Sequence, residues 1–395
     1  MRPSSPQETR SPSQSPDDGS PGSSLDESVK VFLDELPWDV RPYNTDGTYV
    51  RSDLPQLSRF EPGLTFIAQR SQWLSFRENA NIIRAALARR IGHPQDVQQE
   101  LTSRLSRTEL DRSGAQVVFS HRAFPLNAGA VPIVWQQAIL DPVMQSAYGV
   151  SEAALTEERD VKGALFRRCA LVQVSTKVES RRHAMMFPDI ADRFVDVAFF
   201  SPRIAPGSRD ALQRHFDKGP VRLLFVGRQA WRKGLDLVLE AFDSLPDSLK
   251  SMTTLTVISN FHRSPIRLPH HPQISVVRDA NPSQVLEEMK RSHIFLNPAR
   301  FESYGLVFHE AMSQGLACIA PDWEVQRELF DEGRAGMLVA PEPKAIQRAI
   351  EALIGDQNLR FKLGEAAWER FGTHYHPAIV ARRYAEIFRR AAAAR

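Results

Sequence analysis

The chain has 395 residues, which exceeds an ordinary single hydrophobic core and predicts two domains of roughly 150 to 200 residues each. Apolar residues make up 42% of the chain and charged residues 25%, a composition typical of soluble globular proteins. A formal net charge of +3 is too small in a chain of this length to indicate a nucleic-acid partner, so none is expected.

Cysteine usage and hydropathy indicate the compartment. Cys169 and Cys318, the two cysteines of the chain, both lie in apolar runs, which favours a reducing environment. No apolar segment approaches the roughly 18 residues that span a bilayer, and the N-terminus lacks the pattern of a signal peptide. We therefore expect a cytoplasmic protein, with peripheral contact at the inner face of the membrane left open.

The N-terminal half alternates strands with helices. Residues 1–26 are rich in Ser, Pro, Gly and charge and are expected to form a disordered tail. We expect strands over 29–33, 64–68, 115–120, 131–135, 170–174 and 194–199, and helices over 72–90, 151–168 and from Thr176 onward. This alternation predicts a mostly parallel sheet with helices on both faces. His121 directly follows the strand 115–120, at the end where doubly wound sheets bind ligands.

An arginine pattern accompanies the expected helix 72–90. Arg70, Arg77 and Arg84 recur at every seventh position and flank the apolar face of this helix. One interpretation is an interfacial helix whose arginines bind anionic lipid headgroups. The alternative is a core helix whose arginine stems lie along its edge, and it is favoured on general grounds.

The C-terminal half restarts the alternation after a Pro- and Gly-punctuated link at 201–207, where we place the hinge. Strands are expected over 221–226, 254–258, 274–277, 293–298, 316–320 and 336–339, and helices over 235–245, 282–291, 303–315, 343–353, 359–371 and 377–393. Two similar α/β halves that face each other across a cleft are therefore predicted.

The segment 301–315 is the most informative stretch of the sequence. It connects two apolar runs as a helix, with Ser303 expected as its N-cap and Gly315 as its C-cap. Glu302 and Glu310 lie eight positions apart, one before the helix and one inside it. Because Glu310 falls on or beside the apolar stripe of the helix, its carboxylate needs specific partners there.

This stretch has an aromatic residue before Glu302, Tyr-Gly-Leu soon after it and Glu-Ala-Met at 310–312. It resembles the Glu-x7-Glu signature of the retaining, nucleotide-sugar-dependent glycosyltransferases of family 4, the group 1 glycosyltransferases. The resemblance runs from about Val221 to about Phe388 and implies the GT-B fold, two Rossmann-like doubly wound domains facing across a cleft. The implied divisions are an acceptor domain, 27–203, a nucleotide-sugar donor domain, 204–373, and a C-terminal helix, 374–395, that crosses back to the first domain.

The resemblance also implies a site for the nucleotide-sugar donor. Gly227, Arg228 and Lys233 match the family pattern Gly-Arg-x4-Lys-Gly, in which both cations contact the diphosphate. An Arg binds phosphate oxygens as a planar fork and a Lys binds them as a point charge. Such bonds accelerate transfer if they strengthen while the diphosphate departs.

A helix start and two carboxylates complete the implied donor site. Backbone amides near Tyr304, Gly305 and Leu306 are expected to meet phosphate oxygens, because helix N-termini favour anions and a Gly permits close approach. By resemblance, Glu302 hydrogen-bonds the hydroxyls of the donor sugar and Glu310 those of the ribose.

The resemblance assigns His121 to a position near the transferred sugar. A neutral imidazole there can orient the sugar or pass the acceptor proton toward the leaving phosphate; a structural histidine at a strand end is the alternative. In such retaining enzymes no side chain is needed as nucleophile, and the leaving phosphate acts as the base. The chain has no Asp-x-Asp and no His/Cys cluster with ligand spacing, so no metal or other cofactor is expected.

Three segments depart from the family pattern. The loop 34–49 holds a single glycine where the family has a Gly-rich loop. Residues 259–263 replace a Gly-x-Gly turn, and residues 322–328 replace a Gly-Gly-x-Pro-Glu turn. The first departure affects the acceptor side most, so the resemblance says least about the acceptor.

The implied function is transfer of a hexosyl group from a nucleotide-diphosphate sugar to a saccharide or lipid-linked acceptor, in cell-surface polysaccharide or glycolipid biosynthesis. Two alternatives stay open. One is a catalytically silent GT-B protein that binds nucleotides or partners, and the other is a different enzyme on this fold, such as a nucleotide-sugar epimerase or a phosphorylase. A nicotinamide-dependent oxidoreductase is disfavoured, because no Gly-x-Gly-x-x-Gly follows a strand.

Overall fold

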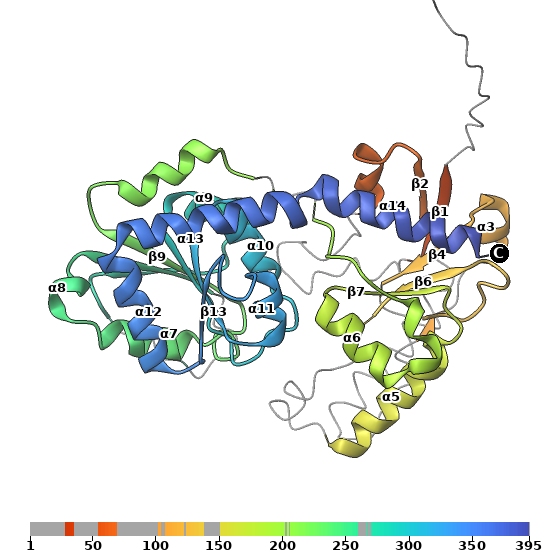
Figure 1. The fold of residues 1–395 in the computed structure, drawn as a ribbon, viewed down its shortest axis with the longest axis horizontal. Coiled ribbons are helices and arrows are strands. Elements are labelled where there is room, and N and C mark those ends of the chain that lie inside the picture. The colour runs from red at the N-terminus through yellow and green to blue at the C-terminus, as the bar shows by residue number, and fades with distance from the viewer. Residues whose placement is uncertain are drawn as a thin grey trace, which may run out of the picture.

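The computed structural model describes residues 28–34, 54–68, 102–103, 107–121, 124–137, 151–201, 204, 206–259, 266 and 270–394. These residues form two α/β domains, with one long C-terminal helix reaching from one to the other (Figure 1). Several expectations lie outside the described residues: the tail 1–26, nearly all of the loop 34–49, the helix 72–90 with Arg70, Arg77 and Arg84, and the segment 260–263.

The N-terminal domain is built on a six-stranded parallel sheet in the order β2-β1-β4-β6-β7-β8. Its strands are β1 (Val29–Asp34), β2 (Leu64–Ala68), β4 (Val117–Ser120), β6 (Ile133–Gln136), β7 (Leu171–Val174) and β8 (Phe194–Asp196). All residues of β4, β6 and β7 are buried, as expected for parallel strands covered on both faces.

Short elements and helices surround this sheet. They are η1 (Leu54–Arg59), α3 (Arg107–Ser113), α5 (Glu152–Phe166), α6 (Lys177–Met186), η2 (Pro188–Arg193) and a two-stranded sheet of β3 (Thr102–Ser103) and β5 (Phe124–Pro125). The predicted helix start at Thr176 is confirmed, because the Thr176 side chain accepts a hydrogen bond from the Glu179 N–H at 3.1 Å.

The C-terminal domain holds a second six-stranded parallel sheet, in the order β11-β10-β9-β12-β13-β14. Its strands are β9 (Val221–Val226), β10 (Thr253–Ile258), β11 (Ile274–Val277), β12 (Ile294–Leu296), β13 (Ala317–Pro321) and β14 (Met337–Val339). The chain starts at the central strand β9, adds strands on one side, then returns to add β12 on the other. The topological switch point therefore lies between β9 and β12.

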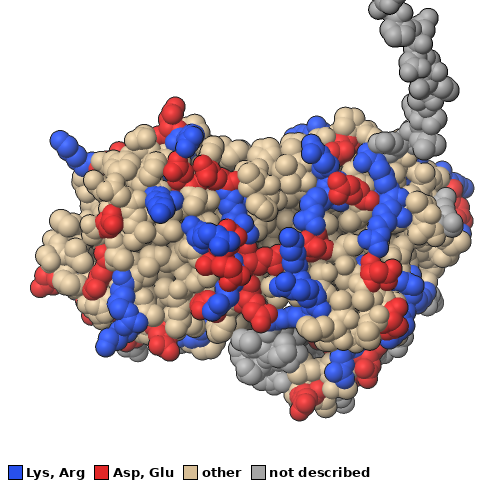
Figure 2. Space-filling view, in the orientation of Figure 1, with Lys and Arg blue, Asp and Glu red and all other residues tan. Residues whose placement is uncertain are grey.

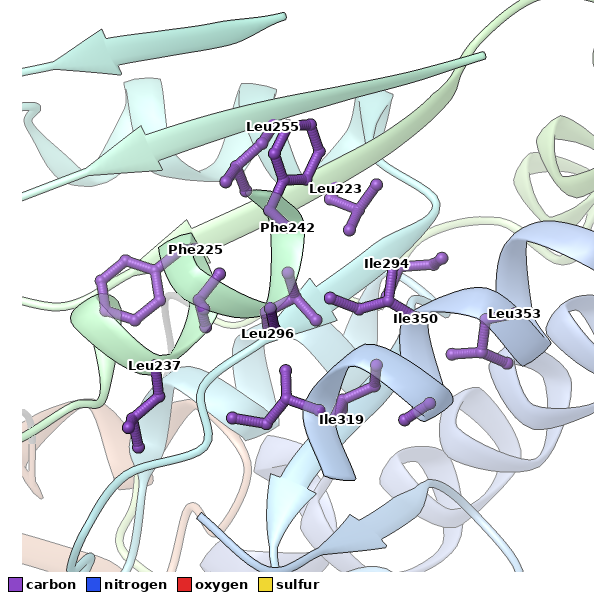
Figure 3. Packing of buried hydrophobic residues seen from close by; sticks show 14 of the residues in the cluster. Leu223, Phe225, Leu237, Phe242, Leu255, Ile294, Leu296, Ile319, Ile350 and Leu353 are labelled. Atoms are coloured by element: carbon purple, nitrogen blue, oxygen red, sulfur yellow. The ribbon is translucent and has the colours of Figure 1, made fainter. Parts of the chain in front are cut away.

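Helices cover both faces of this second sheet. They are η3 (Arg209–Phe216), α7 (Leu235–Asp243), α8 (Asp247–Lys250), α9 (Pro282–Arg291), α10 (Leu306–Ser313), α11 (Glu324–Leu329), α12 (Pro343–Gly355) and α13 (Gln357–Arg370). Leu223 and Phe225 of β9 pack with Ile294 of β12 and with Ile350 and Leu353 of α12 in one buried cluster (Figure 3). The predicted α/β alternation is thus confirmed.

The opposite face of the second sheet fixes α10. Phe308 of α10 packs edge-to-face on Phe295 of β12, with ring centroids 5.6 Å apart, and on Phe330, at 5.2 Å. All three rings are fully buried. Because aromatic pairs of this kind hold a defined geometry, the N-terminus of α10 is set at the end of β12.

The predicted return of the last helix to the N-terminal domain is confirmed. A π-helical turn, Phe371–Tyr375, joins α13 to α14 (Pro377–Ala393), and the two helices run nearly end to end across the molecule (Figure 1). Tyr384 and Phe388 of α14 insert into the N-terminal core, where the Phe388 ring lies 5.7 Å from that of Phe119. An apolar helix face therefore ties the two domains together.

A charged contact joins the domains at a second place. The Glu328 carboxylate of α11 accepts hydrogen bonds from the N–H groups of Lys177 and Val178, at 2.9 and 2.8 Å, in the first turn of α6. Arg182 of α6 pairs with Glu324 of α11 at 2.7 Å. A groove of about 790 Å³ lies between α6 and α11. Figure 2 shows cationic and anionic side chains gathered over this boundary.

The structure corrects the expected caps of the segment 301–315. The helix α10 begins at Leu306, and its N-cap is Gly305 rather than Ser303. Gly305 has φ 87°, in the left-handed region that only glycine adopts readily, so the backbone turn and not a serine side chain starts the helix. The C-cap is Gln314, and Gly315 follows it with φ 67°.

Other differences concern short elements. The sequence analysis missed α3, α8 and α11, and β8 ends at Asp196 rather than at residue 199. Residues 322–328, which replace the family's Gly-Gly-x-Pro-Glu turn, contain most of α11. Its N-cap, Trp323, makes no side-chain capping bond, so the sequence carries no start signal there. Within the described residues, no helix is long and apolar enough to cross a membrane.

We predict that Phe388→Ala destabilises the N-terminal domain by about 3 to 5 kcal/mol, because the substitution leaves a cavity among packed aromatic rings. Urea denaturation followed by circular dichroism measures this change. Glu386→Ala, on the exposed side of the same helix, is the control and is expected to shift the free energy of unfolding by less than about 0.5 kcal/mol. Equal effects of the two substitutions would contradict the packing role of α14.

Candidate functional site

Two loops meet at the topological switch point of the C-terminal sheet. One follows β9 and spans 227–234, and the other follows β12 and spans 297–305. Both leave the carboxyl ends of neighbouring parallel strands, which is where open α/β sheets bind ligands. The sequence-predicted donor residues other than Glu310 all lie on these two loops or at the first residue of α10.

Glycines let the first loop pack tightly. A Cβ on Gly227 would lie 2.9 Å from the Cβ and Cγ atoms of Lys233, so the Lys233 stem rests directly on the glycine. A Cβ on Gly234, at φ 78°, would lie 2.4 Å from the carbonyl oxygen of Pro298 in the second loop. The two loops are therefore in backbone contact, which side chains at these positions would prevent.

A buried ion pair connects the two loops. The Nζ of Lys233 donates a hydrogen bond to Oε2 of Glu302, and the two side chains are only 12% and 6% exposed. Arg232 Nη1 lies 4.0 Å from the same oxygen, and its guanidinium stands 5.3 Å from the Phe301 ring centroid. The structure thus brings two predicted site residues together and adds Arg232, which the sequence analysis missed although it directly precedes Lys233.

Neighbouring cations keep Glu302 ionised although it is buried. Burial favours the neutral form of Glu302, but the cations of Lys233 and Arg232 hold the pKa of this carboxyl below its ordinary value. Burial also lowers the pKa of Lys233, against the raising effect of Glu302. Glu302 therefore remains an anion at neutral pH, and it keeps acceptor capacity beyond the Lys233 bond.

The start of α10 presents backbone donors beside this pair. Gly305 caps the helix without a side-chain hydrogen bond, and a Cβ there would lie 3.2 Å from Glu302 Cγ. Within the described residues, no hydrogen bond is made by the N–H groups of Leu306 and Val307. A helix end with open donors and a positive dipole end is suited to an anion.

Tyr304 contributes backbone rather than side chain to this region. Its ring is buried, stacks on His309 with centroids 4.7 Å apart, and meets Phe199 of the N-terminal domain edge-to-face at 4.8 Å. His309 in turn contacts Tyr375 of the π-helical turn at 4.5 Å. The aromatic cluster joins the helix start to both chain segments that cross between the domains.

Glu310 lies one turn further along α10, with only part of its surface exposed. Within the described residues its carboxylate has no ion pair and no hydrogen bond, and burial raises its pKa to about 7. Glu310 is partly buried, in line with its predicted place on or beside the apolar stripe, but the specific partners expected there are not found within the described residues. An unpaired group in such a position is available to ligand hydroxyls.

The two remaining predicted residues, Arg228 and His121, lie in different domains. Arg228 is exposed on the first loop, five residues from Lys233. His121 is exposed at the carboxyl end of β4, in the N-terminal domain. Among the described residues, no group of three or more His, Cys, Asp or Glu side chains is arranged to hold a metal ion.

A further polar residue that the sequence analysis missed lies at the switch point. Asn297, at the end of β12, is fully buried and donates from Nδ2 to the carbonyl oxygen of Val226 at 3.0 Å. Among the residues that the structure describes, its Oδ1 has no hydrogen-bond partner. Asn297 therefore connects the ends of the two strands from which the loops emerge. In the sequence, only its place at the end of an apolar run could have pointed to this role.

Comparison with known proteins identifies the C-terminal domain. Residues 209–370 match the family model of "Glycosyl transferases group 1". The D-inositol 3-phosphate glycosyltransferase of Arthrobacter sp. (strain FB24) is 28% identical over 221 residues, which cover 48% of this chain and 50% of that relative. The chain spans about half the length of the curated relatives it matches, or somewhat less.

Solved structures agree with the whole fold. The sucrose-phosphate synthase of Thermosynechococcus elongatus superposes with a TM-score of 0.61 and 14% identity, covering 93% of this chain and all of that one. Anabaena HepE, solved in complex with UDP, gives a TM-score of 0.60 and 15% identity over 91% and 99% of the two chains. These similarities confirm the predicted GT-B fold.

We predict that Glu310→Gln stabilises the chain at pH 8 by roughly 1 to 3 kcal/mol and has little effect near pH 5. The folded-state pKa of about 7 exceeds the ordinary value of 4.5, so the folded state binds more protons between these values. Stability of the unmodified chain therefore falls as pH rises through this window, and glutamine removes that loss.

Urea denaturation at the two pH values measures the effect. Glu240→Gln, an exposed site on α7, is the control and is expected to show no such pH-dependent difference. An equal effect of Glu310→Gln at pH 5 and pH 8 would mean that the carboxylate is paired rather than merely buried.

Proposed function

Because the chain belongs to the group 1 glycosyltransferases over residues 209–370, we propose that it transfers a hexosyl group from a nucleotide-diphosphate sugar with retention of configuration. The observation that carries this proposal is the buried Lys233–Glu302 pair at the switch point, beside the open N-terminus of α10. In this proposal the cation of the pair binds phosphate and the adjacent anion binds sugar hydroxyls.

The diphosphate is assigned to the positive side of this site. Lys233 has three N–H donors and uses one on Glu302, so it can hold a phosphate oxygen with another. Arg228, exposed on the same loop, supplies a second cation, and the amides near Gly305 and Leu306 supply neutral donors. As the bond to the anomeric carbon breaks, negative charge develops on the phosphate oxygens, and these donors then bind more strongly.

The two glutamates are assigned to hydroxyl groups on either side of the diphosphate. Glu302, kept ionised by Lys233 and Arg232, accepts hydrogen bonds from the sugar. Glu310, without a partner of its own within the described residues, accepts those of the ribose. Binding of the ribose would supply the hydrogen bonds that this carboxylate lacks.

Transfer needs no side-chain nucleophile in this proposal. The anomeric carbon loses its bond to the phosphate oxygen and gains one to the acceptor oxygen on the same face. The acceptor proton passes to the departing phosphate. His121 follows the carboxyl end of β4, the end of the strands at which doubly wound sheets bind ligands. In this proposal it orients the sugar or relays that proton. Neither a metal nor another cofactor is required.

We assign the acceptor to a saccharide or a lipid-linked saccharide in cell-surface polysaccharide or glycolipid biosynthesis, at the cytoplasmic side of the membrane. We assign the acceptor side of the site to the N-terminal domain, as the family resemblance implies. A lipid-linked acceptor would bring the chain to a membrane surface.

We predict that a nucleoside diphosphate raises the thermal stability of the chain by an amount corresponding to about 2.7 kcal/mol at 100 times its dissociation constant. UDP, ADP, GDP and TDP are the probes, measured by differential scanning fluorimetry. Arg228→Ala and Lys233→Ala are each expected to remove most of the shift, because each deletes one charge-assisted bond to phosphate.

Arg291→Ala is the matched control. Arg291 ends α9 at the opposite edge of the sheet, and its side chain is exposed. The shift should persist in this variant. If no diphosphate shifts the unmodified chain, or if both loop variants keep the full shift, the assignment of the diphosphate to Arg228 and Lys233 is overturned.

A further inference from the structure

Arg300, on the second loop, contacts three residues on the first loop and at the start of α7. The Arg300 guanidinium makes two parallel bonds to Asp236, Nη1 to Oδ1 at 2.8 Å and Nη2 to Oδ2 at 2.5 Å. Nη1 also donates to the carbonyl oxygen of Trp231 at 2.5 Å, and the guanidinium carbon stands 4.5 Å from the Trp231 ring centroid. The backbone N–H of Arg300 donates to the carbonyl oxygen of Arg232 at 2.9 Å.

These contacts lie directly beside the candidate site. Arg300 precedes Glu302 by two residues, and Asp236 follows Lys233 by three, in the first turn of α7. The two pairs are therefore neighbours: Lys233–Glu302 joins the two loops, and Arg300–Asp236 joins the second loop to the start of α7. Asp236 is held in place by α7, because a carboxylate is favoured in the first turn of a helix.

The Lys233–Glu302 and Arg300–Asp236 pairs differ in their exposure to solvent. Lys233 and Glu302 are nearly inaccessible, whereas Arg300 and Asp236 are 24% and 34% exposed. A partly exposed pair adds little to overall stability. Its planar, two-bond geometry instead fixes direction and distance between the groups that it joins.

We propose that Arg300 and Asp236 are positioning residues for the donor site: they set the separation of Lys233 and Glu302, and with it the fit of the diphosphate and the sugar. The inference rests on the function proposed above. It goes beyond that function by assigning a role to two residues outside the family motifs, acting through Lys233 and Glu302 rather than on the substrate.

The test compares a diphosphate with its monophosphate. The probes are the nucleoside diphosphate of the UDP, ADP, GDP and TDP panel that the unmodified chain binds most tightly, and the corresponding monophosphate, with dissociation constants from calorimetry. In Arg300→Gln and in Asp236→Asn, diphosphate binding should weaken about tenfold while monophosphate binding changes by less than about twofold. A merely structural role would weaken both nucleotides alike.

Two further variants sharpen the test. The double variant R300Q/D236N should bind the diphosphate no more weakly than the worse single variant, because the two residues act as one unit. Arg300→Lys keeps the charge but not the two-bond geometry, and it should resemble Arg300→Gln. Asp236→Asn preserves side-chain shape, so it serves as the test if Arg300→Gln fails to fold.

Arg334→Gln is the matched control. Arg334 and Asp331 form the same kind of two-bond pair, at 2.6 and 2.8 Å, outside the two site loops. This variant should leave both dissociation constants unchanged. An unchanged diphosphate-to-monophosphate ratio in Asp236→Asn overturns the positioning role alone. Absence of nucleotide binding by the unmodified chain overturns the proposed function and the positioning role together.

Discussion

The Lys233–Glu302 pair is the interaction on which the candidate site depends. Two opposite charges that are almost fully removed from water gain from each other only if their geometry is held well, because each loses hydration on burial. The chain meets this requirement with glycines that allow close packing, rather than with large side chains. Gly227 lies under the lysine stem, Gly234 brings the loops together, and Gly305 turns the chain beside the glutamate. Each glycine removes a side chain that would push the two charges apart.

The sheet order explains why this pair forms where it does. Strands β9 and β12 are neighbours in space but lie about 70 residues apart in the chain, so their loops meet only after the sheet has assembled. Asn297 then joins the strand ends, and the aromatic contacts of Phe308 hold α10 in line with β12. The arrangement of charges is thus a product of the fold and not of any local segment.

The difference between local and long-range contacts also decides which features the sequence predicts well. Apolar runs and helix periodicity gave β9, β11, α9 and α14 with their exact ends, because each is specified by residues within it. The motif residues were found through their family pattern. The sequence did not reveal Arg232, Arg300 or Asn297 as site residues, because their roles arise from contacts with distant segments. It also predicted Ser303 as the N-cap where the structure has Gly305, since side-chain capping is visible in a sequence and a left-handed turn is not.

The contact between Glu328 and the start of α6 has a mechanical consequence. The two domains are held by apolar packing along α14 and by charged hydrogen bonds between α11 and α6. Dissolved ions screen the second kind of attachment and leave the first intact. Rising ionic strength therefore weakens the contact between α6 and α11 more than the apolar packing of α14, so the boundary between the domains loosens first at α6 and α11.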